Sequence, residues 1–432
     1  MKRPLALLLT ALTALGAFFG TAPAVHAEEA PAPEHAASAV LYNFENDKTL
    51  FSYEEDKRVF PASTVKLMTG ILAYEELGGD GAATITVSAE MLDGVKGNNI
   101  ALREGEIVTV SDMLHALLVN GANDAAQVLA VAVSGSVEDF VTRMNQKAQL
   151  LGAYSTYYTN PTGMHSDAMV TTAHDTALIA RYAYRLDGFT DITSQPKYVM
   201  ERTNKSDYRN LFNRNSQLSK FYDTRYYYAA SLGMNAGYTQ QGGYCIVSCA
   251  RRDALTYLCV VMDAEETEDG VYSYKNANRL LDWAFSAYAY AEVLSAQTRI
   301  CELPVSLSST VDYVTLVPAE AIVRYLPAGI DTASEIKLSY NTYEETLTAP
   351  VEAGQVCGFV TVTYCDEILG SVDLVSSSTV TRSEFLYLLE RIRTFTRSRF
   401  FRASVVFAIL FGAAYIVYEA RRREKQYRRR RF

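Results

Sequence analysis

The sequence predicts an α/β (α+β) domain, followed by a small all-β domain and a C-terminal transmembrane helix. Three observations lead to this prediction. Strand patterns lie at both ends of residues 39–290, with helical patterns between them, which indicates a sheet flanked by helices. Short β-branched stretches then recur from Arg299 onward. Residues 403–418 contain no charged side chain and are almost wholly apolar.

The composition fits a two-domain protein without a metal or a nucleic-acid partner. The 432 residues are 49% hydrophobic, enough for substantial cores, and exceed the length of one ordinary domain. The net charge of −9 includes a tail of +6 at residues 419–432, which leaves −15 elsewhere and no basic surface for nucleic acid. Six cysteines are too few for a disulfide scaffold, and no His or Cys motif indicates a metal. We therefore expect no metal and no other cofactor.

The first 27 residues have the features of a secretory signal peptide. Lys2 and Arg3 precede a mostly apolar run over residues 5–20, and small residues lead to Ala27 before Glu28. This pattern predicts export with cleavage after Ala27. An uncleaved membrane anchor is the alternative, and the well-formed small-residue site favours cleavage.

The predicted first domain, residues 28–296, begins with a hairpin. Residues 39–44 and 49–53 have strand composition, and turn residues separate them. Pro61 suits the first turn of a helix whose apolar side chains continue through Leu72. A second helix is expected from Val110 until Gly121 breaks it, and Asn123 can cap the next one. Further helices are expected at 137–151, 172–184 and 277–290, and a second strand pair at 244–250 and 255–262.

The C-terminal third predicts β-structure and then a membrane anchor. An all-β domain is expected over residues 297–378, with strands at 305–307, 314–317, 336–340, 359–364 and 369–374. A juxtamembrane amphipathic helix follows over 379–402, a transmembrane helix over 403–418 and a basic cytoplasmic tail over 419–432. The apolar run is shorter than the roughly 20 residues that span a bilayer, so Phe400 and Phe401 extend it if Arg402 snorkels. A helix lying on the membrane surface is the alternative.

Ser63 is the candidate nucleophile, with Lys66 three positions later. On a helix these positions share a face, so Lys66 can place its amine beside the Ser63 hydroxyl. Burial disfavours the ammonium form, so a desolvated lysine can act as a general base, and a helix N-terminus favours the developing oxyanion. Taken alone, the spacing is better explained by a helix start with an exposed lysine.

Several segments give this pair a context. Residues 61–69 resemble the nucleophile helix of the serine D-alanyl-D-alanine carboxypeptidases, the low-molecular-mass penicillin-binding proteins. Residues 117–126 resemble the family's second motif, residues 159–165 a further anchor, and residues 233–239 occupy the place of its Lys-Thr-Gly strand. Residues 347–355 resemble the β-domain that follows the catalytic domain. The resemblance runs in order over residues 39–378 and implies a penicillin-binding/β-lactamase-like transpeptidase fold.

The resemblance also implies a set of site residues. Ser63 is the nucleophile that becomes acylated, and Lys66 is its general base. Asn123 orients the substrate or Lys66, unless its role is only that of a helix cap. Oxyanion stabilisation would use the backbone N–H groups of Ser63 and Tyr238, and Gly237 permits close approach of the substrate to its strand.

Three positions depart from the family pattern. Gly121 stands where the second motif has a serine that helps return a proton to the leaving amine. Asn235 and Ala236 replace the lysine and threonine that bind the substrate's terminal carboxylate. A lost charge-assisted bond is worth roughly 1.5–3 kcal/mol, and a lost proton relay lowers the rate by on the order of 10²–10⁴-fold. Arg251 or Arg252 could replace the missing charge, although a solvated turn explains them better.

Three functions follow from this pattern. The first, which we favour because Ser63, Lys66 and Asn123 are all present, is a D,D-carboxypeptidase that removes the terminal D-alanine from peptidoglycan stem peptides and that β-lactams can acylate. The second is a catalytically impaired peptidoglycan-binding or scaffold protein of the same fold. The third is a peptidase or transpeptidase for a substrate without a free terminal carboxylate. The expected location is the bacterial cell membrane, with one C-terminal span and the catalytic domain outside.

Overall fold

The computed structural model describes residues 29–79 and 81–429. The chain divides into two compact units between Ala289 and Tyr290. The expected signal peptide, residues 1–27, lies outside the described residues. The domain bounds inferred from the sequence remain predictions, and each unit is described below by itself.

The first unit is built on a five-stranded antiparallel sheet. Its strands are β1 Ala36–Asn43, β2 Lys48–Tyr53, β7 Ser231–Thr239, β8 Gly243–Arg252 and β9 Leu255–Ala264. They lie in the order β2-β1-β9-β8-β7, so both expected strand pairs form, and β1 joins them by pairing with β9. β8 and β9 are mostly buried along their length, because both faces of the sheet are covered.

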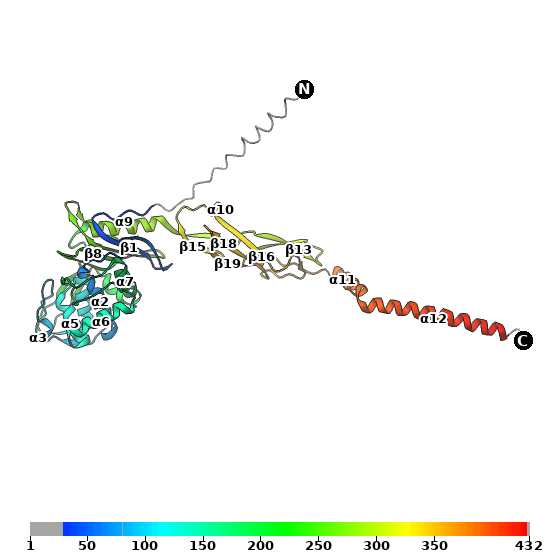
Figure 1. The fold of residues 1–432 in the computed structure, drawn as a ribbon, viewed down its shortest axis with the longest axis horizontal. Coiled ribbons are helices and arrows are strands. Elements are labelled where there is room, and N and C mark those ends of the chain that lie inside the picture. The colour runs from blue at the N-terminus through cyan, green and yellow to red at the C-terminus, as the bar shows by residue number, and fades with distance from the viewer. Residues whose placement is uncertain (1–28, 80, 430–432) are drawn as a thin grey trace, which may run out of the picture. The chain divides into compact units, whose positions relative to one another are not determined.

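Helices cover the two faces of this sheet. The helical segments of this unit are η1 Ala62–Thr64, α2 Val65–Leu77, α3 Ala89–Leu92, α4 Val110–His115, η2 Ala116–Asn120, α5 Asn123–Ser134, α6 Val137–Leu150, α7 Ala173–Arg185, α8 Phe189–Thr193, η3 Thr224–Tyr226 and α9 Tyr272–Ala287. α2, α5, α6 and α7 lie on one side, where Leu67, Met68 and Ile71 are fully buried (Figure 1). α9 packs along the other side, against β8 and β9. The expected sheet flanked by helices is therefore confirmed.

The last helix of this unit differs from its expected position at 277–290. α9 begins at Tyr272 and ends at Ala287, where β12 Tyr288–Leu294 follows. Its N-cap residue is Val271, which makes no side-chain capping bond, so the sequence carries no start signal at the true N-terminus. Three two-stranded antiparallel sheets complete the unit: β3 Thr84–Thr86 with β4 Ile107–Thr109, β5 Lys197–Met200 with β6 Arg209–Phe212, and β10 Glu266–Thr267 with β11 Gly270–Val271.

The second unit contains the expected all-β domain. Its strands are β13 Cys301–Ser306, β14 Tyr313–Pro318, β15 Ile322–Pro327, β16 Ile336–Thr342, β17 Leu347–Thr348, β18 Val356–Tyr364 and β19 Glu367–Ser376, with a short helix α10 Thr332–Glu335. Six of them form one sheet in the order β16-β18-β19-β14-β13-β17 around a core that includes Leu316, Val360 and Leu374. β15, which pairs with β12, and β17 were missed, because neither has a clean alternation of buried and exposed residues.

The chain ends in two helices, α11 Glu384–Arg397 and α12 Arg399–Arg429. Ser383 caps α11 by accepting a hydrogen bond from the Leu386 N–H, and the apolar side chains expected on one face are exposed. Ser398 separates the two helices, so the single juxtamembrane helix expected over residues 379–402 is interrupted, and it begins only at Glu384. Within α12, Arg399–Arg423 is long and apolar enough to cross a membrane.

Candidate active site

Ser63 and Lys66 lie at the start of the buried helix α2. The short helix η1 carries Ser63 and continues directly into α2, whose first turn carries Lys66. The Lys66 Nζ donates to the Ser63 Oγ at 3.4 Å and to the Thr162 carbonyl at 2.5 Å. The i, i+3 spacing thus places the amine beside the hydroxyl.

Lys66 is almost completely buried, with 2% of its surface exposed. Burial, and then the positive charge of Arg214, lower the pKa of Lys66 from 10.5 to about 7. A substantial fraction of the amine is therefore neutral at neutral pH, which is the form that a general base requires. The alternative of a helix start with an exposed lysine is wrong.

Two glycines bring backbone close to Ser63. A side-chain carbon on Gly237 of β7 would lie 2.7 Å from the Ser63 Oγ, so a larger residue would obstruct the hydroxyl. Gly163 has φ +78°, and a side chain there would collide with the Ala62 carbonyl. Strand β7 therefore lies against the Ser63 hydroxyl, and the turn at Gly163 lies against the backbone of Ala62 and Ser63.

The second motif follows the π-helical turn η2. Gly121 has φ +74°, and a side-chain carbon there would meet Arg214 Cγ at 3.8 Å and Asn98 Nδ2 at 3.9 Å, which is ordinary contact. Asn123 is the first residue of α5 rather than its cap, which is Ala122. Its Nδ2 donates to the Lys96 carbonyl at 2.7 Å, and its buried Oδ1 has no partner among the described residues. The helix-cap alternative for Asn123 is therefore wrong.

The third motif lies on β7 and supplies no positive charge. Asn235 is buried, with 6% of its surface exposed, and its Oδ1 has no hydrogen-bond partner among residues 29–79 and 81–429. Ala236 and Gly237 line the cavity described below, whereas Asn235 lies outside its lining. Tyr238 is half-exposed, and its ring packs 4.4 Å from that of Tyr244.

A cavity of about 500 Å³ is lined by most of the predicted site residues and by Arg214, which the sequence analysis missed. Its lining includes Ser63, Lys66, Gly121, Asn123, Ala236, Gly237, Tyr238 and Arg214. The guanidinium carbon of Arg214 lies 5.2 Å from the centre of the Tyr222 ring, and Arg214 forms no ion pair within the described part of the chain. Arg214 therefore offers the cavity a positive charge with no carboxylate bonded to it, whereas Asp223, which lines the same cavity, is paired with Arg225 at 2.7 Å.

Arg251 and Arg252 do not supply the missing charge. Arg251 donates to the Tyr184 hydroxyl, and Arg252 forms a 2.7 Å ion pair with Asp282. Both lie at the end of β8 and outside the cavity lining, so the suggestion that they could rescue the third motif is wrong.

The position of Arg214 has only a faint sequence signal. Asn213 and Asn215 flank it, and such residues are frequent in turns because their side chains bond nearby backbone. Asn213 Nδ2 donates to the carbonyls of Thr193 and Gln195, at 3.1 and 2.9 Å, which fixes the turn. An arginine held between two buried asparagines is thus positioned by its neighbours.

The sequence matches two family models in succession. Residues 24–266 match the family described as D-alanyl-D-alanine carboxypeptidase. Residues 290–382 match the C-terminal domain of penicillin-binding protein 5. The two matches follow the order of the two units described above.

Individual relatives agree with these matches. The chain is 28% identical over 363 residues to D-alanyl-D-alanine carboxypeptidase DacF of Bacillus subtilis, which covers 82% of this chain and 88% of that protein. It is 30% identical over 236 residues to DacB2 of Mycobacterium tuberculosis, covering 54% of this chain and 76% of that protein. Penicillin binding protein 5 from Haemophilus influenzae matches with a TM-score of 0.57 and 26% identity, over 82% of this chain and 100% of that chain.

Proposed function

This chain belongs to the family of D-alanyl-D-alanine carboxypeptidases and is a serine-type hydrolase, and we propose that it removes the terminal D-alanine of peptidoglycan stem peptides through an ester on Ser63. The observation that carries the residue assignment is the contact between Ser63 and the buried Lys66, whose pKa is about 7. β-Lactams are the proposed covalent ligands of the same serine.

The proposed acylation begins with a proton transfer. The neutral Lys66 amine takes the Ser63 proton while Oγ attacks the carbonyl carbon of the terminal peptide bond. The backbone N–H groups of Ser63 and Tyr238 stabilise the resulting oxyanion. The bond to the D-alanine nitrogen then breaks, that nitrogen takes up a proton, and the acyl group stays on Ser63. Water, deprotonated by Lys66, hydrolyses the ester and regenerates the serine.

Gly121 changes how the proton returns to the leaving amine. No side-chain hydroxyl is present at this position, so the Lys66 ammonium is the proposed donor. The buried Oδ1 of Asn123 can accept a hydrogen bond from this ammonium or from a substrate amide. Loss of a relay typically lowers the rate by on the order of 10²–10⁴-fold, so slow turnover is expected relative to enzymes that keep the serine.

Arg214 is the proposed partner of the substrate's terminal carboxylate. It lines the same cavity as Ser63, and no carboxylate of the described residues forms an ion pair with it. A guanidinium can bind a carboxylate through two parallel hydrogen bonds, which a lysine cannot do. This assignment explains how a D,D-carboxypeptidase can operate with Asn235 and Ala236 in its third motif.

Glutamine in place of Arg214 is expected to lower kcat/KM for D-alanine release by about ten- to 150-fold, mostly through KM, since a charge-assisted bond is worth roughly 1.5–3 kcal/mol. The measurement is steady-state kinetics on a muropeptide ending in D-Ala-D-Ala. Arg252→Gln removes the same charge outside the cavity and serves as the control. Equal kcat/KM in the native and Arg214→Gln proteins contradicts the assignment.

The proposed location is the outer face of the bacterial membrane. α12 supplies the single span, and the basic residues from Arg421 to Lys425 mark the cytoplasmic side. α11, with exposed Phe385, Leu388 and Ile392, lies at the membrane surface in this proposal. Stem peptides of the wall then reach the catalytic unit from outside the cell.

The whole protein in detergent tests this function directly. Incubated with a muropeptide that carries a pentapeptide stem, it is expected to release one D-alanine per stem and leave a tetrapeptide. Liquid chromatography with mass spectrometry measures both products. Binding of the muropeptide without release contradicts the proposal and favours a binding protein of the same fold, and release only from a substrate with an amidated terminus favours the third hypothesis.

A further inference from the structure

One wall of the cavity, with Gly97 and Asn98, belongs to a long irregular loop. The loop connects α3 to β4 and has no helix or strand over residues 93–106. Its backbone groups therefore depend on other partners to hold one conformation. Asp124 of α5 supplies the first, since its carboxylate accepts the N–H groups of Ile100 and Leu102 at 3.0 and 3.1 Å.

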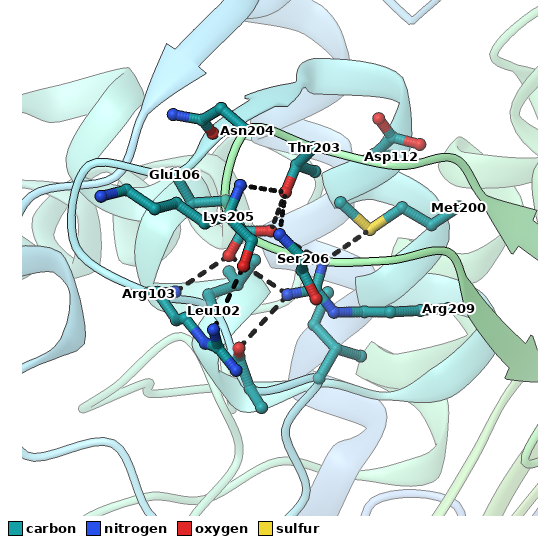
Figure 2. Close-up of polar contacts among 12 residues, drawn as sticks. Leu102, Arg103, Glu106, Asp112, Met200, Thr203, Asn204, Lys205, Ser206 and Arg209 are labelled. Carbon is teal, nitrogen blue, oxygen red and sulfur yellow. Dashed lines mark hydrogen bonds and ion pairs between the residues drawn. The ribbon is translucent and has the colours of Figure 1, made fainter.

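Glu106, with a fully buried side chain, holds the far end of this loop. Its carboxylate forms a two-bond ion pair with the Arg209 guanidinium on β6, with N–O distances of 2.8 and 3.1 Å. The same carboxylate accepts the Thr203 hydroxyl at 2.7 Å and the Arg103 N–H at 3.0 Å (Figure 2). A buried charge with this set of partners has one stable position, because an unpaired charge there is strongly destabilising.

Further hydrogen bonds tie the loop to the β5–β6 hairpin. Arg209 also donates to the Ala101 carbonyl at 3.2 Å. Arg103 reaches across to the Lys205 carbonyl at 3.1 Å (Figure 2). Asn204 accepts the Ile107 N–H at the start of β4 and donates to the Gly105 carbonyl of the loop, both at 2.8 Å. Loop and hairpin are thus joined at several points around one buried ion pair.

The hairpin leads directly to Arg214. β6 ends at Phe212, the turn at Asn213 follows, and the Arg214 N–H donates to the Val119 carbonyl at 3.0 Å. The ion pair therefore connects two walls of the cavity, the loop that carries Asn98 and the segment that carries Arg214.

We propose that Glu106 and Arg209 are positioning residues for the carboxypeptidase reaction. Their ion pair, called the clamp below, fixes the Arg214 segment relative to the Asn98 loop and so sets the site that receives the substrate's carboxyl end. Glu106 and Arg209 both lie outside the cavity lining. The clamp therefore affects substrate binding indirectly, through the positions of Arg214 and the Asn98 loop. The substrate named in this proposal rests on the proposed function. The geometry of the clamp rests on the hydrogen bonds described above and is independent of that function.

The test removes both charges at once, in Glu106→Gln/Arg209→Met. Removing both leaves no unpaired buried charge, and the glutamine can still accept from Thr203. KM for the pentapeptide muropeptide is expected to rise about 10- to 100-fold with little change in kcat, because a binding group is misplaced. The single variant Arg209→Lys keeps the charge, so its KM should lie between those of the native protein and the double variant. A merely structural role would lower the melting temperature without this separation of KM from kcat.

Hydrogen exchange gives a second measurement that needs no turnover. In the double variant, amides of residues 96–102 and 213–216 should exchange about ten-fold faster or more, while those of α6 stay unchanged. Arg202→Gln breaks the exposed 3.2 Å pair with Asp207 in the same hairpin and should change neither KM nor exchange. Unchanged KM in the double variant overturns the proposal. If the native chain releases no D-alanine, which contradicts the proposed function separately, unchanged exchange overturns the clamp.

Discussion

Alanine in place of Ser63 is expected to abolish D-alanine release and covalent labelling by a β-lactam. The Ser63 Oγ is the atom that forms the ester, and it is the hydroxyl that contacts the Lys66 amine, at 3.4 Å. Removing a nucleophile lowers kcat by on the order of 10⁴-fold or more, which places the variant near the detection limit. Release is measured by chromatography, and labelling by the mass that one β-lactam adds to the intact chain.

Ser52→Ala is a matched control, because Ser52 is an exposed serine on β2 of the same unit. It should retain native release and native labelling. Labelling of Ser63→Ala at the native rate would place the nucleophile elsewhere. If native chain and Ser63→Ala both bind the muropeptide equally and release nothing, the protein is a binding protein with a penicillin-binding fold.

The second large effect is expected at Lys66. Methionine keeps most of the side chain's volume and removes the base, so acylation of Ser63 should slow by on the order of 10²–10⁴-fold. In the native chain, acylation should rise about ten-fold per pH unit below pH 7 and level off above it, because only neutral Lys66 accepts the serine proton. The measurement is the second-order rate constant for a fluorescent β-lactam between about pH 5 and pH 9.

Two comparisons make this pH profile diagnostic. Arg214→Gln should move the midpoint to higher pH, since the positive charge of Arg214 helps to lower the Lys66 pKa. The shift should be partial, because burial is the larger cause. Lys57→Met, at an exposed lysine, should leave the profile unchanged. A flat profile, or a midpoint near that of an ordinary lysine, contradicts the role of Lys66 as the base.

Four strands of the central sheet and the longer helices of the catalytic unit were predictable from the sequence, because their periodicity is local, whereas the short strands β3 to β6, β10 and β11 were missed. The hairpin of residues 39–53 and the strands around Arg251 have clear turn residues, and Ser136 and Thr172 cap α6 and α7 directly before their first residues. α9 was misplaced because Val271 gives no such signal. Local signals therefore located elements well wherever a cap or turn residue was present.

The candidate site was predictable only in part. Ser63 and Lys66 are close in sequence, so their contact follows from helix geometry. Arg214 enters the cavity from a distant turn, and neither periodicity nor a motif of its own connects it to Lys66. Glu106 and Arg209 likewise form an ion pair although they are 103 positions apart in the sequence. Contacts of this kind depend on the tertiary fold. They cannot be predicted from a single sequence when no motif connects the two residues.

The burial of Lys66 also makes the free energy of unfolding depend on pH. The unfolded chain holds this lysine near its ordinary pKa of 10.5, whereas the native chain holds it at about 7. Between these values the unfolded chain binds the additional proton, so the free energy of unfolding increases as pH rises across that interval. Below about pH 7 the penalty for burying the ammonium is fully present, roughly 5 kcal/mol if nothing compensates it. The residue that enables the chemistry is thus a point at which acidification weakens the catalytic unit.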